Sequence, residues 1–424
     1  MPELPARPRA ALVANLLLCS LMTGFLLFLF EIGLRRFRPL ASSQYSYRIP
    51  DPTLGWRLRP NAHAQLRDPE YSHVVTINSR GWRDVEHNLA RTAGVRRIVL
   101  LGDSFMEGYS VDLDHTFARL LEKELNRSIP TEVINLGVGG YGTLQEYLAF
   151  TQEGRTYEPD IVLLGFLPAN DSVDNSYTLQ QELWEGAPER EQLFGRPSAR
   201  LGAGDGFEVI APDIQRAVAL AEERRRRDRS APWWKRTELY ELGRRAWSRL
   251  RRGTDSGAAG PREGADPRVW MGQYLCQEPP EHAEAWRITE RIMRRLRETV
   301  EATGARLFVF TVPTQGDFDE RFLRTGLETL GDADAICVDP SRPTRTVVDL
   351  LRRQNIEHLD LRPEFQAAMQ VQRLIPFHMK KDHHWNETGN ALAAEIVSHA
   401  LAEIMRLPAH HPGPGAGATV EAPR

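Results

Sequence analysis

Two periodicities alternate along the chain, and together they predict its fold. Short runs rich in aliphatic and aromatic residues are typical of strands buried in a parallel sheet. They predict strands at 97–101, 131–136, 161–166, 306–311 and 356–361. Apolar residues spaced by three and four positions predict helices at 114–126, 143–152, 281–303, 347–354 and 390–405. This alternation predicts a three-layer α/β fold, in which a doubly wound parallel sheet with right-handed crossovers is covered by helices.

The N-terminus has a different pattern. Ala10–Phe30 is an uncharged, mostly apolar run of 21 residues, long enough as a helix to span the ~30 Å hydrocarbon layer of a membrane. A signal peptide has a shorter apolar region and a cleavage site with small residues. Pro39-Leu40-Ala41 is a poor cleavage site. We therefore expect a single-pass anchor that is not removed.

Charge alone favours one orientation of this anchor. Arg7 and Arg9 precede the apolar run, whereas Arg35, Arg36 and Arg38 follow it. The side with more basic residues usually stays in the cytoplasm, which would place the body of the protein there. The chemistry discussed below favours the opposite orientation.

The patterns divide the chain into six parts. They are a cytoplasmic stub with the transmembrane anchor (1–40), an irregular lead-in (41–93), the first half of the core (94–175), an insertion (176–280), the second half of the core (281–407) and a disordered tail (408–424). The tail is expected to be disordered because it is rich in Pro, Gly and Ala.

The insertion is expected to be partly helical, with a flexible Gly-rich loop at 253–264. It combines the basic run 224–227 with Trp233, Trp234 and Trp247. Such a segment lies on a membrane as an amphipathic helix, or presents a basic face to an anionic glycan. The interpretation favoured here is a solvated basic helix whose tryptophans pack on the core.

Composition excludes some classes of function. The 424 residues carry a net charge of −3, whereas a dedicated nucleic-acid-binding protein has a large basic excess. The three cysteines, Cys19, Cys276 and Cys337, include no C-x-x-C pair, which argues against a cysteine zinc site. Cys276 and Cys337 form either a disulfide in an oxidising compartment or two buried thiols.

Polar residues follow the predicted strands where a parallel sheet binds its ligands, at the carboxyl ends. Ser104 follows the first strand, a glycine turn ending at Gly140 follows the second, and Asn170 follows the third. Asp382 and His384 come just before the last helix. A serine, an acid–histidine pair and several N–H donors are the groups that acyl transfer needs.

These blocks resemble a known family. Gly102-Asp103-Ser104-Phe105, Asn135-x4-Gly140, Asn170-Asp171 and Asp382-x-His384 are similar, in the same order, to the blocks of SGNH/GDSL hydrolases. The similarity covers residues 95–175 and 300–405 and implies a flavodoxin-like three-layer sheet.

The resemblance implies a role for each residue. Ser104 is the expected nucleophile, His384 its general base and Asp382 the acid that orients His384. The oxyanion hole is expected from the backbone N–H groups of Ser104 and Gly140 and from the side-chain amide of Asn170. Asp103, Asp171 and Trp385 are expected to support the site, and His378 and His383 to be structural.

The last block departs from the usual D-x-x-H, because Lys381 stands three positions before His384. The sequence Asp382-His383-His384-Trp385 is instead similar to the D-x-H-W block of alginate-type polysaccharide O-acetyltransferases, where that block precedes the serine. This variant favours acetyl transfer without establishing it.

The resemblance implies a serine-dependent ester hydrolase or O-acyl(acetyl)transferase that acts through an acyl-enzyme on Ser104. Its expected substrate is an acylated, cell-surface carbohydrate or a small ester. No cofactor, metal or nucleic acid is expected, and a membrane acyltransferase is a candidate partner. Such a role places the protein in the inner (plasma) membrane, with its catalytic domain outside the cytoplasm.

Two other functions remain open. The domain is alternatively an inactive glycan-binding or scaffold module of a polysaccharide assembly system. A dinucleotide-binding oxidoreductase is a lesser alternative, because the sequence from Gly137 to Gly142 matches G-x-G-x-x-G and Asp171 is a candidate ribose ligand. That alternative leaves Ser104, Asp382 and His384 without a role.

Overall fold

The computed structural model describes residues 9–37, 47–68, 70–183, 195–230, 232–240, 242–243, 247, 267–327, 336–379 and 382–406. The expected flexible loop at 253–264 and the tail from 408 lie outside these residues.

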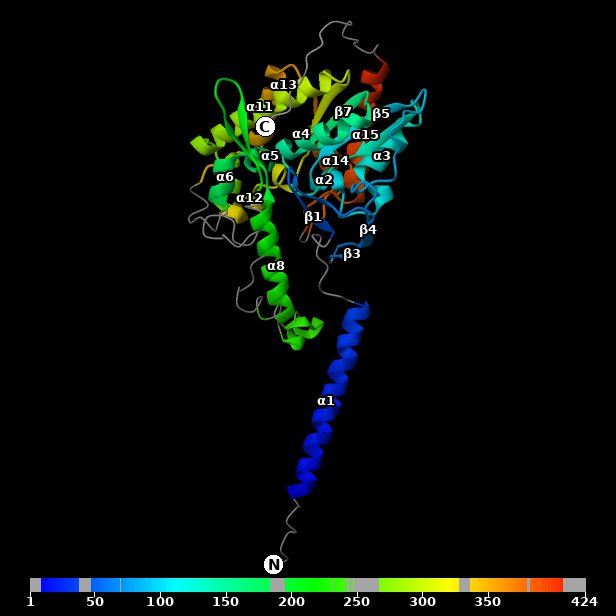
Figure 1. Cartoon of the computed structure of the whole chain (residues 1–424), viewed down its shortest axis with the longest axis vertical. Helices are drawn as coiled ribbons and strands as arrows, with labels where there is room; N and C mark the ends of the chain where they lie inside the picture. The colour runs from blue at the N-terminus through cyan, green and yellow to red at the C-terminus, as the bar shows by residue number, and fades with distance from the viewer. Residues whose placement is uncertain are drawn as a thin grey trace, which may run out of the picture.

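The core is a five-stranded, all-parallel sheet (Figure 1), which confirms the predicted fold class. Its strands are β5 (Arg96–Gly102), β6 (Thr131–Asn135), β7 (Ile161–Phe166), β10 (Arg306–Thr311) and β11 (Glu357–Asp360). They lie in the order β11-β10-β7-β5-β6. The chain therefore moves outward from β5 to β6 and then returns to β7 on the other side of β5. A reversal of this kind creates a crevice at the carboxyl ends of β5 and β7.

Successive residues of a strand point to opposite faces of the sheet, and both faces of this one are buried. Ile98 and Leu100 of β5 share one hydrophobic cluster with helices α3, α14 and α15. Val99 and Leu101 share the other with α4, α11 and α13. The bounds are α3 (Phe117–Leu125), α4 (Thr143–Gln152), α11 (Pro280–Glu301), α13 (Arg342–Arg353), α14 (Arg362–Val371) and α15 (Glu387–Arg406). The sheet thus lies between two helical layers.

The lead-in is more regular than its Pro- and Gly-rich sequence indicates. It forms two antiparallel hairpins, β1 (Arg48–Asp51) with β2 (Gly55–Leu58), and β3 (His63–Arg67) with β4 (Ser72–Thr76). In β4, buried His73 and Val75 alternate with more exposed neighbours. The hairpins form because one face of each packs on the core, where Leu58, Leu66 and Val75 join the cluster of α4 and α11.

The insertion contains short helices and one hairpin. Helix α5 (Asp171–Asn175) ends the first half of the core. The described elements of the insertion are α6 (Tyr177–Leu183), β8 (Ser198–Leu201), β9 (Phe207–Ile210), α8 (Ile214–Ser230), the 3-10 turns η3 (Trp233–Arg236) and η4 (Gly272–Tyr274), and α10 (Pro267–Met271). The expectation that its tryptophans pack on the core is wrong. Trp233, Trp234 and Trp247 are 78%, 45% and 59% exposed.

A disulfide links Cys276, which follows η4, to Cys337, which precedes α13. The backbone N–H of Cys276 also donates to the carbonyl of Cys337 over 3.1 Å. These contacts fix the end of the insertion against the second half of the core.

Helix α1 (Arg9–Phe37) stands apart from the body of the molecule (Figure 1). Within it, Leu12–Leu34 is long and apolar enough to cross a membrane, and the residues from 12 to 30 are exposed. The exposed side chains at positions 12–30 are mostly large and apolar. This surface is poorly suited to water and well suited to lipid.

Candidate functional site

Ser104 is the first residue of the short helix α2 (Ser104–Glu107), directly after β5. Asp103 is the N-cap, because its carboxylate accepts the Phe105 N–H over 2.9 Å. Gly102 has φ +155°, and a methyl group there would lie 2.3 Å from Met106 Cγ. The tight turn after β5 therefore requires glycine, and it leaves the Ser104 side chain free of a capping role and partly exposed.

His384 reaches Ser104 from the loop before α15. Its Nε2 lies 2.8 Å from Ser104 Oγ, across 280 positions of the chain. Its Nδ1 lies 2.9 Å from Asp382 Oδ1. The structure thus brings together all three residues of the expected triad, with distances suited to proton transfer.

The two ionisable members of this triad stabilise each other's charge. Burial alone favours neutral Asp382, but the neighbouring His384 charge and hydrogen bonds from His384 and Tyr71 hold the pKa of Asp382 well below its usual range. Burial also opposes the charged form of His384, yet Asp382 outweighs it and raises the pKa of His384. An ionised carboxylate therefore increases the basicity of the imidazole that contacts Ser104.

Two tyrosines that the sequence analysis missed contact the same carboxylate. Tyr71 donates its hydroxyl to Asp382 Oδ2 over 2.8 Å. Tyr109 donates to Asp382 Oδ2 over 3.1 Å, and its oxygen lies 3.0 Å from His384 Nδ1. Two segments therefore bind Asp382 Oδ2: the β3–β4 hairpin through Tyr71 and the segment after α2 through Tyr109.

Glu107, also missed, fixes the glycine turn after β6. Its fully buried carboxylate accepts the Gly139 N–H over 2.6 Å and the Tyr47 hydroxyl over 2.7 Å. A methyl group at Gly139 would lie 3.5 Å from Ser104 Cβ, so the turn approaches the serine closely. Gly140 has φ +81°, a left-handed conformation that favours glycine.

Asn135 ties this turn to the helix that begins with Ser104. Its side-chain amide donates to the Met106 carbonyl over 2.8 Å, and its Oδ1 accepts the Gly137 N–H over 2.9 Å. Among the described residues, no acceptor is found for the N–H of Ser104 or of Gly140. Both groups thus have the capacity to bind a ligand oxygen.

Asn170 follows β7, the neighbour of β5. It occupies the N-cap position of α5, but its side chain makes no capping hydrogen bond and is partly exposed. Asp171 is instead fully buried, with Oδ2 accepting the Leu167 N–H over 3.1 Å. This burial is unsuited to the ribose contact of the dinucleotide alternative, and it supports the loop that presents Asn170.

A cluster of buried acidic side chains includes Asp103, the residue before Ser104. Burial raises the pKa of Asp103 to about 6. Burial and mutual repulsion also raise the pKa values of Glu146 and Asp171 well above the usual range. Asp174 is the fourth acid of this cluster, and its Oδ2 lies 3.3 Å from Nη1 of Arg196.

Trp385 packs against Phe105, the side chain that contacts the His384 ring. It is 1% exposed, and its indole N–H donates to the Pro313 carbonyl over 3.0 Å. Its ring centroid lies 5.2 Å from that of Phe105, which in turn lies 4.6 Å from that of His384. His383 points elsewhere, with Nδ1 2.7 Å from Gln315 Oε1, and His378 lies beside Tyr71.

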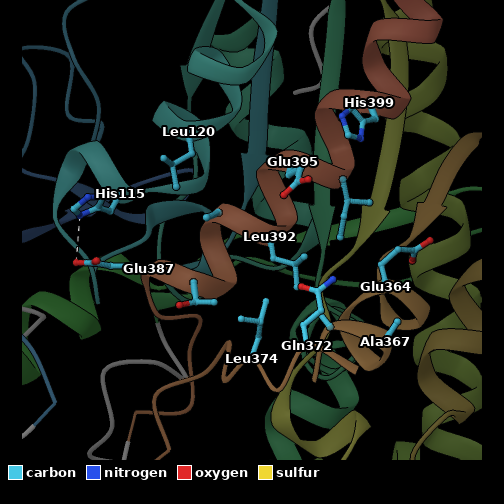
Figure 2. A pocket seen from close by; sticks show the side chains of 14 residues that line it. His115, Leu120, Glu364, Ala367, Gln372, Leu374, Glu387, Leu392, Glu395 and His399 are labelled. Carbon is cyan, nitrogen blue, oxygen red and sulfur yellow. Dashed lines mark ion pairs between the residues drawn. The ribbon is translucent and has the colours of Figure 1, made fainter. Parts of the chain in front are cut away.

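A separate pocket of about 700 Å³ lies away from these residues, between α3, α14 and α15 (Figure 2). His115 Nδ1 lies 3.2 Å from Glu387 Oε1, and both residues line the pocket. Within the described part of the chain, these two and Asp112 are the one group of side chains arranged to hold a metal ion, and all three are exposed. The pocket includes none of the expected site residues.

Comparison with known proteins gives one family match. Residues 270–419 match the family described as "SGNH hydrolase-like domain, acetyltransferase AlgX". No curated protein sequence matches the chain.

Several solved structures are also similar. An acetyl xylan esterase, AlAXEase, is 13% identical with a TM-score of 0.34, over 72% of this chain and 99% of that one. A protein of the G-D-S-L family from Desulfitobacterium hafniense DCB-2 is 11% identical with a TM-score of 0.32, over 72% of this chain and 98% of that one. A two-domain esterase active on acetylated mannans is 12% identical with a TM-score of 0.36, over 77% and 54%.

The family match covers α11, β10, β11 and the loop that bears Asp382 and His384. The order of the blocks extends the resemblance to the half of the core that bears Ser104. Residues 270–419 are therefore similar to an SGNH hydrolase-like domain of the AlgX type.

Proposed function

We propose that this chain is a serine-dependent acyl-ester hydrolase or O-acetyltransferase with Ser104 as its nucleophile. The observation that carries the proposal is the continuous contact from Ser104 Oγ to His384 Nε2 (2.8 Å) and from His384 Nδ1 to Asp382 Oδ1 (2.9 Å). A serine hydroxyl becomes a useful nucleophile when an adjacent, oriented base removes its proton.

In the first half of the reaction, His384 takes the Ser104 proton as Oγ bonds to the acyl carbon. The carbonyl electrons move to oxygen, which then accepts hydrogen bonds from the N–H groups of Ser104 and Gly140 and the amide of Asn170. When the tetrahedral intermediate collapses, the alkoxide leaves with the proton held by His384. The products are an acyl-enzyme ester on Ser104 and a free alcohol.

In the second half, His384 removes a proton from the acceptor, whose oxygen bonds to the acyl carbon. Ser104 leaves and regains its proton from His384. Water as the acceptor gives hydrolysis, and a sugar hydroxyl gives acyl transfer. The match to a domain described as an acetyltransferase supports an acetyl group. The resemblance of Asp382-His383-His384-Trp385 to the D-x-H-W block of polysaccharide O-acetyltransferases supports a carbohydrate acceptor, and a membrane acyltransferase would be a suitable source of acyl groups.

We also propose that α1 anchors the protein in the plasma membrane with the domain outside the cytoplasm. The Cys276–Cys337 disulfide supports this side, because disulfides persist in oxidising compartments. The excess of arginines after the apolar run favours the other side. Alkaline phosphatase fused after Pro408 is expected to be active; an inactive fusion that is present in full length would place the domain in the cytoplasm.

The function is tested by labelling the full chain in detergent with a fluorophosphonate and measuring its intact mass. One adduct is expected on the wild type and none on Ser104→Ala, with equal thermal stability for both. An acetyl ester is then supplied with water alone or with a glycan acceptor, which separates hydrolysis from transfer. A folded wild type without an adduct contradicts an activated Ser104 and favours a glycan-binding module.

A further inference from the structure

The body of the protein contacts the end of α1. Both carboxylate oxygens of Glu31 accept backbone hydrogen bonds, from the N–H of Glu238 and of Leu239, each over 3.0 Å. Glu31 lies one helical turn before Leu34, the last residue of the apolar stretch. Consistent with this contact, Glu31, Gly33 and Leu34 are partly buried, whereas the residues from 12 to 30 are exposed.

The contacting segment has an unusual surface. We call the described residues between 232 and 247 the tryptophan segment. Trp233, Trp234, Leu242 and Trp247 are 78%, 45%, 38% and 59% exposed. Tryptophan is rarely left in water to this degree, and several large apolar side chains exposed together indicate a binding surface.

The position of this surface identifies its partner. The lower end of α8 and the turn η3 extend from the body toward α1 and reach the level of its upper end (Figure 1). That level is where the hydrocarbon layer would end if α1 spans a membrane. Tryptophan is enriched at this depth, because its indole combines an apolar ring with an N–H donor.

Basic residues in the segment and in the neighbouring helix α8 agree with the same partner. The Lys235 ammonium lies 5.4 Å from the centroid of the Trp234 ring. Exposed Arg226 lies on α8, within the basic run 224–227. Basic side chains beside tryptophans suit the headgroup region, particularly where lipids are anionic.

We propose that the tryptophan segment inserts into the interfacial layer of the membrane that α1 spans, as a second contact with lipid. This inference rests on the proposed anchor. It gives the body two points of attachment, so that the domain is held at a fixed orientation above the lipid.

The test uses the full chain in phosphatidylcholine–phosphatidylglycerol vesicles whose acyl chains are brominated near the headgroup. Bromine quenches tryptophan fluorescence at short range, and α1 itself contains no tryptophan. Bromolipid is expected to quench part of the wild-type emission, and Trp233→Phe/Trp234→Phe is expected to lose most of that quenching. Bromine placed deep in the acyl chains is expected to quench less than bromine near the headgroup.

Leu89→Trp in the Trp233→Phe/Trp234→Phe background is the matched control. Leu89 is 44% exposed, and its carbonyl accepts a hydrogen bond from Arg97 at the beginning of β5. The beginning of the sheet, near the end of α15, is the part of the body farthest from α1 (Figure 1). This added tryptophan is expected to remain unquenched.

Flotation separates the two hypotheses. If the protein does not float with the vesicles, the anchor is wrong and the inference falls with it. If it floats but bromolipid quenches the wild type and the double variant equally, the anchor stands and the inference is wrong. Quenching of the wild type by aqueous iodide alone would likewise overturn it, and would indicate a surface for a protein partner.

Discussion

The Tyr71 hydroxyl donates a hydrogen bond of 2.8 Å to Asp382 Oδ2, between residues 311 positions apart. Asp382 Oδ1 meanwhile binds His384. The lead-in hairpin therefore supports the acid of the candidate triad directly, which makes Tyr71 a positioning residue in the proposed reaction.

Tyr71→Phe is expected to lower kcat about three- to tenfold with little change in KM, since one charge-assisted hydrogen bond is worth about 1.5–3 kcal/mol and Tyr109 retains its own. Without the Tyr71 hydrogen bond, the Asp382 carboxylate should stabilise protonated His384 more strongly. The pKa of His384 should then rise, and the acidic limb of the kcat/KM profile should move to higher pH. Tyr147→Phe on α4, whose ring packs against Phe207, is the control. An unchanged pH profile would leave Tyr71 with a purely structural role.

Activity should depend on pH through His384. The base works only when unprotonated, and its pKa is raised in the folded protein. Activity should therefore be lost as pH falls through a midpoint above the ordinary value of about 6.5. Asp382→Asn should lower that midpoint and reduce kcat by about 10⁴, as loss of the acid does in Ser–His–Asp triads. Equal midpoints for the two proteins in rates of p-nitrophenyl acetate hydrolysis would contradict this assignment.

Asn170→Ala should reduce kcat by about 10²–10³ with KM nearly unchanged, because the proposed amide contact forms with the oxyanion rather than with the ground-state ester. The side chain makes no capping bond to α5, so the melting temperature should hardly change. Asn175→Ala is a useful comparison, since the Asn175 side chain holds the Leu144 N–H and Thr289 and its loss should reduce stability instead. Wild-type kinetics in Asn170→Ala would remove it from the oxyanion hole.

Glu146 should make the protein less stable at alkaline pH. Burial raises its pKa in the folded state above the unfolded value of about 4.3. At pH values between the unfolded and the folded pKa of Glu146, the folded protein therefore binds more protons than the unfolded chain. The free energy of unfolding falls as pH rises through that window.

Glu146→Gln removes this ionisation at little change in size. Its melting temperature should exceed that of the wild type at pH 8, and the difference should shrink toward pH 4. Glu298→Gln, at an exposed glutamate of α11, should have no such effect. A Glu146→Gln difference that is the same at both pH values would show that the carboxyl group does not titrate on unfolding.

Much of the core follows from local pattern. The strands at Ile161–Phe166 and Arg306–Thr311 lie where the apolar runs predict them, because a strand covered on both faces must be apolar throughout. Helix α14 was not predicted, since only Phe365 and Ala368 of its residues are buried and its pattern is weak. The strand order was also not predicted, because it depends on which strands meet in space.

Some residues of the candidate site could likewise be predicted from the sequence, and others could not. Ser104, Asn170 and His384 were predictable because each stands at the end of a predicted element and matches a family block. Tyr71 and Glu107 were not, because their roles depend on contacts between distant segments. A tyrosine in a hairpin and a glutamate in a short helix carry no local signal of such contacts.

The 280 positions between Ser104 and His384 also order events in time. The ribosome makes α1 first and the serine soon afterwards, but the histidine follows only after ~15–55 s at 5–20 residues per second. Throughout that interval the growing chain lacks the base that the proposed mechanism assigns to Ser104. If Ser104 is the proposed nucleophile, the nascent chain is expected to be inert toward the esters around it until His384 has been made.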